Sequence, residues 1–177
     1  ITDKIIMYAP TYRGKPKFKN NPVNIPSLDF SKIIQVLHEA FGGTWKVLYR
    51  GHYYYQEHTI LDDVCDASCY DDMQELLVAC DVLLTDYSST IWDFSLTNKP
   101  CFLYVPDIKM YDNVRSFYTQ PATWPFPLAQ TQEDLVDCIL NYDQEINNCR
   151  TKEHITNFLS YENINASKKV LETIGLI

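Results

Sequence analysis

The sequence predicts an α/β fold, a Rossmann-like parallel sheet with helices on both faces, as a single domain over residues 1–177. Short apolar runs typical of buried strands alternate with amphipathic stretches of helical period along the chain. A length of 177 residues suits one domain, and 46% hydrophobic with 21% charged residues is a globular balance. Strands that alternate with helices favour a parallel sheet covered on both sides.

The expected strands are short apolar runs bounded by turn-forming residues. Pro10 ends the first run, and Pro100 precedes the last. The run 82–85 has almost no polar alternation, which is typical of a strand covered on both faces. The expected strands are residues 4–9, 45–49, 62–66, 82–85 and 101–105.

The expected helices begin at capping side chains and carry apolar residues three and four positions apart. In the first helix, Phe30 and Leu37 share one face, Ser27 is the expected N-cap, and two glycines end the helix. The proline-rich stretch 106–130 is expected to be irregular. The expected helices are 27–41, 71 or 72 to 80, 88–96, one that begins at Thr131 before acidic residues, 143–159 and 163–175.

Composition excludes several classes of function. A net charge of −8 and a pI of about 4.9 disfavour nucleic-acid binding, which requires a broad basic surface. No apolar run reaches the roughly 20 residues of a membrane span, and no secretory signal is visible. Because the chain starts at Ile1 and its first strand follows almost at once, we expect it to be a piece of a longer protein.

The six cysteines, at 65, 69, 80, 101, 138 and 149, contain no CxxC pair and no zinc-binding spacing. Most lie in apolar runs, so we expect reduced core residues of a cytosolic protein. The paired carboxylates at 62–63 and 71–72 are typical of turns and helix caps. The sequence therefore predicts no metal site and no bound cofactor.

In a doubly wound sheet the ligand lies beyond the carboxyl ends of the strands, so the residues after each strand are the candidates. After the first strand, Thr11 and Arg13 are expected near a phosphate, and Lys15, Lys17 and Lys19 are basic enough to meet an anionic polymer or lipid surface. A merely solvated basic loop is the alternative.

After the second strand, Arg50 and His52 are two residues apart, so both side chains point to the same side of an extended chain. Arginine binds phosphate with two hydrogen bonds, and histidine donates a hydrogen bond or a proton. A surface arginine beside a capping histidine is the alternative.

After the fourth strand, a turn of small hydroxyl residues runs into a helix. Ser88 and Ser89 offer hydroxyls beside the free N–H groups of the helix start, which is a pattern typical of an anion site. Asp93 lies one helical turn later and is expected to accept hydrogen bonds from ligand hydroxyls. An ordinary serine N-cap is the alternative. There is neither a GxGxxG motif nor a P-loop.

These motifs together resemble the CDP-glycerol glycerophosphotransferase family, the teichoic acid primases and polymerases. The resemblance covers nearly the whole chain, in order. The blocks that carry it are Tyr8-Ala-Pro-Thr-Tyr-Arg13, Arg50-Gly-His52, Tyr70-Asp-Asp-Met-Gln-Glu-Leu-Leu77, Cys80-Asp-Val-Leu-Leu-Thr-Asp-Tyr-Ser-Ser89, Asp93-Phe94, Asn98-Lys-Pro100, Tyr104-Val-Pro-Asp107, Arg115-Ser-Phe-Tyr118 and Tyr161-Glu-Asn-Ile-Asn-Ala-Ser167.

The resemblance implies that this chain is the C-terminal, nucleotide-binding half of a GT-B fold, with an N-terminal domain outside the fragment. It implies transfer of glycerol phosphate from CDP-glycerol, the donor, to a polyol-phosphate polymer or lipid-linked acceptor, with release of CMP. It also implies a cytoplasmic enzyme at the inner face of the cell membrane, peripheral to it. The fragment alone is expected to be inactive.

For the residues, the resemblance implies that Arg50 and His52 are catalytic and contact the diphosphate of the donor. A second catalytic histidine, the base, would lie in the N-terminal domain. The implied substrate-binding residues are Pro10, Thr11, Arg13, Ser88, Ser89 and Asp93.

Departures from the family pattern include Tyr53 where proline is usual and Ser116 where glycine is usual. A CDP-ribitol enzyme, or one that uses another polyol, therefore remains open. A GT-B glycosyltransferase is the alternative function, although such domains often carry a ribose-binding Glu where this chain has Asp107. A receiver-like binding module is disfavoured because no acidic pair follows the first strand.

Overall fold

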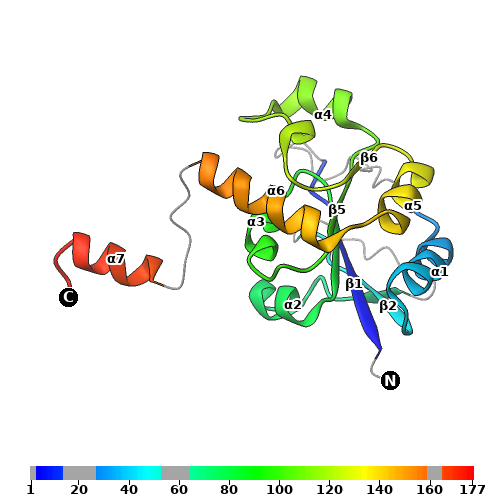
Figure 1. The fold of residues 1–177 in the computed structure, drawn as a ribbon, viewed down its shortest axis with the longest axis horizontal. Helices are drawn as coiled ribbons and strands as arrows, with labels where there is room; N and C mark the ends of the chain where they lie inside the picture. Colours follow the sequence, from blue (N-terminus) through cyan, green and yellow to red (C-terminus); the bar gives the residue numbers. More distant parts are fainter. Residues whose placement is uncertain (1–2, 14–26, 53–63, 159–164) are drawn as a thin grey trace.

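The computed structural model describes residues 3–13, 27–52, 64–158 and 165–177. These residues contain a six-stranded sheet in which all neighbouring strands are parallel, in the order β3-β2-β1-β4-β5-β6 (Figure 1). The strands are β1 (Lys4–Ala9), β2 (Trp45–Tyr49), β3 (Val64–Asp66), β4 (Val82–Thr85), β5 (Cys101–Tyr104) and β6 (Leu128–Ala129). The predicted Rossmann-like α/β fold is confirmed.

The strand order reverses direction between β1 and β4. The chain winds outward from β1 to β2 and β3, then returns to place β4 on the other side of β1. Ala9 pairs with Thr85, and the Thr85 hydroxyl donates to the Ala9 carbonyl at 2.7 Å. The segments that leave β1 and β4 therefore diverge from a common point, which is the ligand crevice of open α/β sheets.

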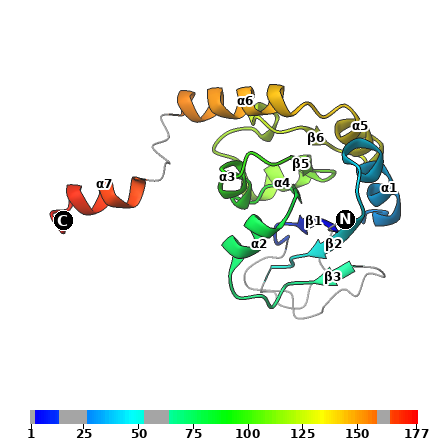
Figure 2. The same ribbon diagram turned by 60° about the horizontal axis from the view of Figure 1, so that its bottom comes forward.

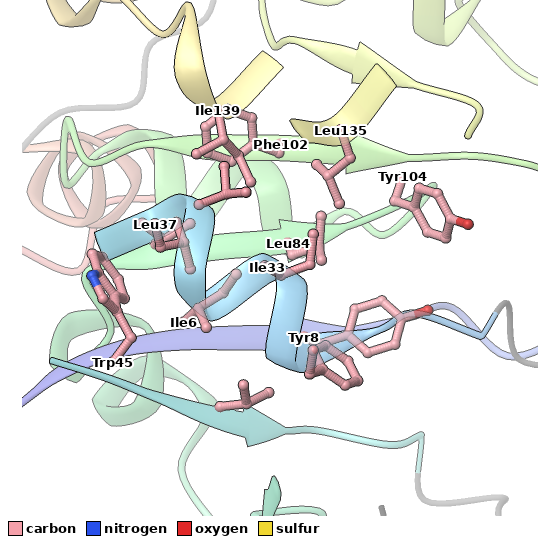
Figure 3. Packing of buried hydrophobic residues seen from close by; sticks show 14 of the residues in the cluster. Ile6, Tyr8, Ile33, Leu37, Trp45, Leu84, Phe102, Tyr104, Leu135 and Ile139 are labelled. Carbon is pink, nitrogen blue, oxygen red and sulfur yellow. The ribbon is translucent and has the colours of Figure 1, made fainter. Parts of the chain in front are cut away.

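Helices cover both faces of the sheet (Figures 1 and 2). The helices are α1 (Phe30–Phe41), α2 (Met73–Ala79), α3 (Thr90–Ser95), α4 (Ile108–Arg115), α5 (Gln132–Leu140), α6 (Gln144–Asn157) and α7 (Ala166–Thr173). One face packs against α1 and α5, and Figure 3 shows Ile33 and Leu37 of α1 with Leu135 of α5 over Ile6 and Leu84 of the sheet. The other face packs against α2 and α3.

Capping side chains fix where the helices begin. Thr131, the predicted start of α5, forms a capping box with Asp134: the Thr131 hydroxyl accepts from the Asp134 amide, and the Asp134 carboxylate accepts from the Thr131 amide. The prediction of Ser27 as the cap of α1 is wrong: Asp29 accepts from the Lys32 amide instead, and the helix starts at Phe30. Asp72 caps α2, as one of the two predicted alternatives.

The stretch 106–130 is more regular than predicted. It contains α4, a single 3-10 turn at Pro121–Thr123 and the short edge strand β6. No residue of α4 is buried, so this helix lies at the surface of the domain.

The prediction of six core cysteines is wrong in part. Cys80 and Cys101 are buried and Cys138 is half-buried, while Cys65, Cys69 and Cys149 are exposed. Among the described residues the cysteines form no disulfide.

The last helices lie outside the sheet layers. His154 of α6 stacks on Trp92 of α3, with ring centroids 5.1 Å apart and planes 7° apart, and this contact holds α6 against the domain. Figures 1 and 2 show α7 standing apart from the sheet, and its Val170 and Ile174 are exposed. No helix within the described ranges is long and apolar enough to cross a membrane.

Candidate active site

The predicted site residues gather at the end of the sheet that is formed by the carboxyl ends of its parallel strands. Pro10, Thr11 and Arg13 follow β1, whereas Arg50 and His52 follow its neighbour β2. Ser88, Ser89 and Asp93 follow β4, the neighbour of β1 on the other side. We call this the carboxyl edge.

Asp86 joins the loop after β1 to the turn after β4. Its carboxylate, which is 2% exposed, accepts from the Thr11 amide at 3.0 Å and from the Thr11 hydroxyl at 2.5 Å. It also accepts from the amide of Tyr87 and forms an ion pair with Arg13. Thr11 and Asp86 are 75 residues apart in sequence, so this contact exists only in the folded sheet.

Arg13 lies inside the fold rather than open to a phosphate. Its side chain is 6% exposed, and its guanidinium contacts Asp86 while Nε and Nη2 donate to the two oxygens of Asp107 at 3.0 and 3.1 Å. Nη1 also donates to the Thr11 carbonyl at 2.6 Å. These contacts satisfy the cation with two carboxylates, which favours a structural part in the site over the direct phosphate contact that we expected.

Asp107 and Tyr87 extend this cluster to the end of β5. The Tyr87 hydroxyl donates to Asp107 at 2.9 Å, and the Tyr87 ring stacks on Tyr111 of α4 with centroids 4.0 Å apart. The Arg13 guanidinium lies over the Tyr87 ring at 5.2 Å. Burial alone would raise the pKa of Asp107, but the hydrogen bonds and charge of Arg13, with the hydroxyl of Tyr87, lower that pKa below its usual value.

Arg50 is oriented by the loop that follows β3. Its Nη1 donates to the carbonyls of Ala67 and Ser68, each at 2.6 Å. Within the described ranges only Nη1 has acceptors, so Nε and Nη2 remain available to a ligand. Arg50 is half-buried.

Gly51 allows the chain to pass close to that loop. Its amide donates to the Ser68 hydroxyl at 2.9 Å, and a Cβ atom at this position would lie 3.0 Å from that oxygen and 3.0 Å from the buried ring of Tyr49. A side chain here would therefore push the Arg50–His52 segment away from its present position.

His52 is half-buried at the carboxyl edge and contacts the ring of Tyr12, with centroids 5.4 Å apart. This contact joins the loops after β1 and β2. Burial lowers the pKa of His52 from its ordinary value of 6.5, which favours the neutral ring. A negative ligand nearby would raise that pKa and favour the protonated ring.

The serine turn leads into α3, which begins later than predicted, at Thr90. The amides of Ile91 and Trp92 in the first turn donate to the carbonyls of Ser88 and Ser89, at 3.3 and 3.0 Å. The Ser88 hydroxyl donates to the Thr90 hydroxyl at 2.9 Å and accepts from the Thr90 amide at 3.3 Å. Ser89 is the N-cap, it is exposed, and its side chain makes no capping bond. Asp93 is exposed on α3, one turn on. The hydroxyl of Ser89 and the carboxylate of Asp93 thus face solvent, as binding to a ligand would require.

Some predictions cannot be placed, and some residues were missed. Lys15, Lys17 and Lys19 lie outside the described residues. Among described residues, no group of three His, Cys, Asp or Glu side chains is arranged to hold a metal, and the expectation of a metal-free site stays a prediction. Sequence reasoning missed Asp86 and Asp107 as the partners of Arg13, because they lie 73 and 94 residues away from it in the sequence.

An apolar groove lies away from the carboxyl edge. It has a volume of about 340 Å³ between α3, α6 and the segment after α4, and Trp92, Leu96, His154 and Phe158 contribute to its walls. None of the predicted site residues lines it. His154 in this wall stacks on Trp92 and so joins α6 to α3.

Comparison with known proteins agrees with the resemblance seen in the motifs. The sequence model of the CDP-Glycerol:Poly(glycerophosphate) glycerophosphotransferase family matches residues 1–176. The chain is 34% identical over 186 residues to a teichoic acid poly(glycerol phosphate) polymerase of Bacillus spizizenii, covering 97% of this chain and 44% of that protein. It is 32% identical over 180 residues to a teichoic acid glycerol-phosphate transferase of Staphylococcus aureus, covering 97% and 45%.

A teichoic acid ribitol-phosphate primase of Bacillus spizizenii is also similar, at 29% identity over 176 residues, 97% of this chain and 44% of that protein. Among solved structures, the wall teichoic acid polymerase TagF superposes with a TM-score of 0.70 at 28% identity, over 98% of this chain and 43% of that one. A variant of TagF soaked with CDPG gives a TM-score of 0.69 at the same identity and coverage. The chain spans less than half the length of these relatives.

Proposed function

This chain belongs to the CDP-glycerol:poly(glycerophosphate) glycerophosphotransferase family, and we propose that it binds the CDP-polyol donor of such an enzyme at its carboxyl edge. The observation that carries this proposal is the meeting of three loops, in which Tyr12 contacts His52 on one side and Thr11 bonds to Asp86 on the other. The carboxyl edge thus offers a cation, a histidine and a turn of hydroxyls to one diphosphate. The full protein would transfer the polyol phosphate to a polyol-phosphate or lipid-linked acceptor.

The whole-protein architecture follows from the same proposal. The chain would be the C-terminal, nucleotide-binding half of a GT-B enzyme, and the rest of the protein would supply the acceptor side and the base. The 177 residues alone would then bind donor without turning it over. Glycerol is the polyol that the polymerase and transferase relatives name, and the ribitol-phosphate primase keeps ribitol as the second possibility.

In the proposed reaction the acceptor hydroxyl attacks the β-phosphorus of the donor. A new P–O bond forms to the acceptor, the P–O bond to the CMP phosphate breaks, and CMP leaves with the bridging oxygen. Phosphoryl transfer depends mainly on positioning and on stabilising charge. Arg50, oriented by the carbonyls of Ala67 and Ser68, would place its Nε and Nη2 on the diphosphate.

His52 would act as the acid for the leaving group. Burial lowers its pKa, and the negative diphosphate of a bound donor would raise that pKa and favour the protonated ring. The ring would then give its proton to the oxygen that leaves with CMP. The acceptor's proton would go to a base outside these 177 residues.

The turn after β4 would hold the remainder of the donor. The exposed Ser89 hydroxyl and the N–H groups before α3 would bind phosphate, and Asp93 would accept hydrogen bonds from the polyol. Pro10, which is buried directly after β1, would line the donor pocket beside Thr11. Asp107 does not support the alternative function of a glycosyltransferase, because its carboxylate already binds Arg13 and Tyr87.

Calorimetric titration of the full-length protein with CDP-glycerol, CDP-ribitol, CMP and UDP-glucose tests the proposal. We expect a CDP-polyol to bind most tightly and His52→Ala to weaken it about tenfold. His38→Ala is the matched control, because His38 lies in the last turn of α1, next to the start of β2 at the opposite end of the sheet. Tighter binding of UDP-glucose would make the protein a glycosyltransferase, and equal binding by His52→Ala would move the donor site elsewhere.

The location of the protein is also a proposal: peripheral attachment at the cytoplasmic face of the membrane, through Lys15, Lys17 and Lys19. Liposomes with anionic lipid should bind the unaltered protein and release it when these lysines become glutamine. Lys168→Gln with Lys169→Gln on α7 controls for lost positive charge. Unchanged binding by the triple variant would remove the lysines from the proposal.

A further inference from the structure

Three loops at the carboxyl edge are held together by one arginine. Arg13 lies in the loop after β1, Asp86 directly after β4, and Asp107 at the start of α4 after β5. These are three adjacent strands of the sheet. The Tyr87 hydroxyl on Asp107 and the Tyr87 ring against the guanidinium add two further contacts between the same loops.

The charge of this cluster is wrong for attracting an anion. One guanidinium meets two carboxylates, so the ionised cluster carries a net charge of −1, and all of the charge on Arg13 is compensated at contact distance. A diphosphate nearby would gain little from the arginine and would be repelled slightly by the excess carboxylate. The cluster therefore needs a role other than electrostatic attraction.

The hydrogen bonds of the cluster indicate that its role is to fix the positions of the loops. Asp86 bonds both the amide and the hydroxyl of Thr11, and the turn that Asp86 begins leads directly to Ser88 and Ser89. Arg13 in turn holds the Thr11 carbonyl and Asp86 with the same nitrogen. The distance between the loop after β1 and the serine turn is thus set by this cluster.

We propose that Arg13, Asp86 and Asp107 are positioning residues, which lock the loops after β1, β4 and β5 so that Thr11 and the serine turn face the donor diphosphate at a fixed separation. This inference rests on the proposed function. Buried ion pairs add little net stability, because desolvation offsets their attraction, but they define one geometry when all their hydrogen bonds are made. The bidentate contact of Arg13 with Asp107 is of that kind.

Asp107→Asn separates positioning from electrostatics. The substitution keeps the size of the side chain, removes one negative charge and replaces one acceptor with an N–H₂ group that cannot accept from Arg13. If the cluster acted through its charge, the variant would bind CDP-glycerol more tightly. If it acts through position, the variant should bind CDP-glycerol about tenfold more weakly, and the loss should persist in high salt, where charge effects are screened.

The matched control is Asp137→Asn, which makes the same change of charge at an exposed position on α5, away from the cluster. If Asp107→Asn unfolds, Arg13→Lys and Tyr87→Phe serve as alternative variants that test the same cluster. The lysine keeps the charge and loses the paired hydrogen bonds. The phenylalanine removes only the hydroxyl that donates to Asp107 and should cost a few-fold in affinity.

The measurements are the Kd for CDP-glycerol and the KM for donor and acceptor in the full-length protein, with circular dichroism to confirm folding. The inference expects a higher donor KM with an unchanged acceptor KM, whereas partial unfolding would lower kcat alone. Equal or tighter donor binding in Asp107→Asn overturns the inference and leaves the proposed function standing. If Asp107→Asn unfolds, the same result in Arg13→Lys and Tyr87→Phe overturns it. No CDP-polyol binding by the unaltered protein overturns both.

Discussion

Replacing Gly51 with alanine is expected to destabilise the domain and weaken donor binding in one step. The new Cβ would lie 3.0 Å from the Ser68 hydroxyl, 3.0 Å from Cε1 of Tyr49 and 3.1 Å from the Tyr49 hydroxyl. Tyr49 is buried, so it has little room to move. All three contacts are shorter than ordinary carbon contacts, and the chain or its neighbours must shift.

The expected magnitude is a balance of two effects. Overpacking of this kind costs about 1–3 kcal/mol. Gly51 does not have a positive φ, so alanine also restricts the unfolded chain and returns about 0.4–1 kcal/mol. A net loss of about 1 kcal/mol follows, which is roughly a fivefold change in the unfolding constant and about 2–4 °C in Tm for a domain of this size.

The functional part of the prediction comes from the neighbours of Gly51. Because Arg50 and His52 flank it, any shift that relieves the contacts also moves both proposed catalytic side chains. A displacement well under 1 Å is enough for a several-fold loss of CDP-glycerol affinity, since phosphate contacts depend on alignment. Urea unfolding and calorimetric titration measure the two effects separately.

A double-mutant cycle with Ser68→Ala is the control. Without the Ser68 hydroxyl, one of the close contacts disappears, so Gly51→Ala should cost at least 0.5 kcal/mol less in that background, by roughly the size of coupling seen for touching residues. The reasoning is refuted if Gly51→Ala leaves both stability and affinity unchanged, or if the cycle shows no coupling.

Three other outcomes are expected. Leu84→Ala, at a fully buried position of β4, should lower the free energy of unfolding by about 2–5 kcal/mol in urea, and a loss below about 1 kcal/mol would contradict the packing described. Thr131→Ala should remove about 1 kcal/mol with the capping box of α5, while Thr131→Ser should keep most of it. Burial lowers the pKa of both His52 and His154 from 6.5, so their neutral forms favour the folded state: stability is full above pH 6.5 and declines as pH falls from there through the folded-state pKa values. Unfolding measured between pH 5 and 7 should show this slope, His154→Gln should flatten it, and a flat profile in the unaltered chain would be evidence against it.

Local patterns were sufficient for most of the elements. The buried strand at 82–85 was recognisable because four apolar or small residues in succession fit a strand with both faces covered. All four residues of that strand are buried. The helix start at Thr131 was recognisable because its capping partners are three residues apart. The cap of α1 was misplaced because Ser27 and Asp29 are both good capping residues, and only the fold selects between them.

The location of the candidate site was predictable from the sequence, whereas the contacts among its residues were not. The rule that ligands lie beyond the carboxyl ends of strands located Thr11, Arg50 and Ser88 correctly at one edge of the sheet. The partners of Arg13 were beyond reach, because Asp86 and Asp107 are 73 and 94 residues away and nothing local pairs them with it. An arginine beside a phosphate and an arginine between two carboxylates look the same in sequence.

The position of β1 in the middle of the sheet also affects how the domain folds while the ribosome synthesises it. β1 is made before the other strands of this sheet, yet one of its two neighbours, β4, and the acceptor of the Thr11 amide lie about 75 residues later. At roughly 5–20 residues per second, the growing chain waits about 4–15 s with one side of β1 unpaired. Ile6 and Met7, which are buried in the finished sheet, must be shielded during that interval. Slower translation of residues 10–80 should therefore lower the yield of folded protein, whereas slowing beyond β5 should not.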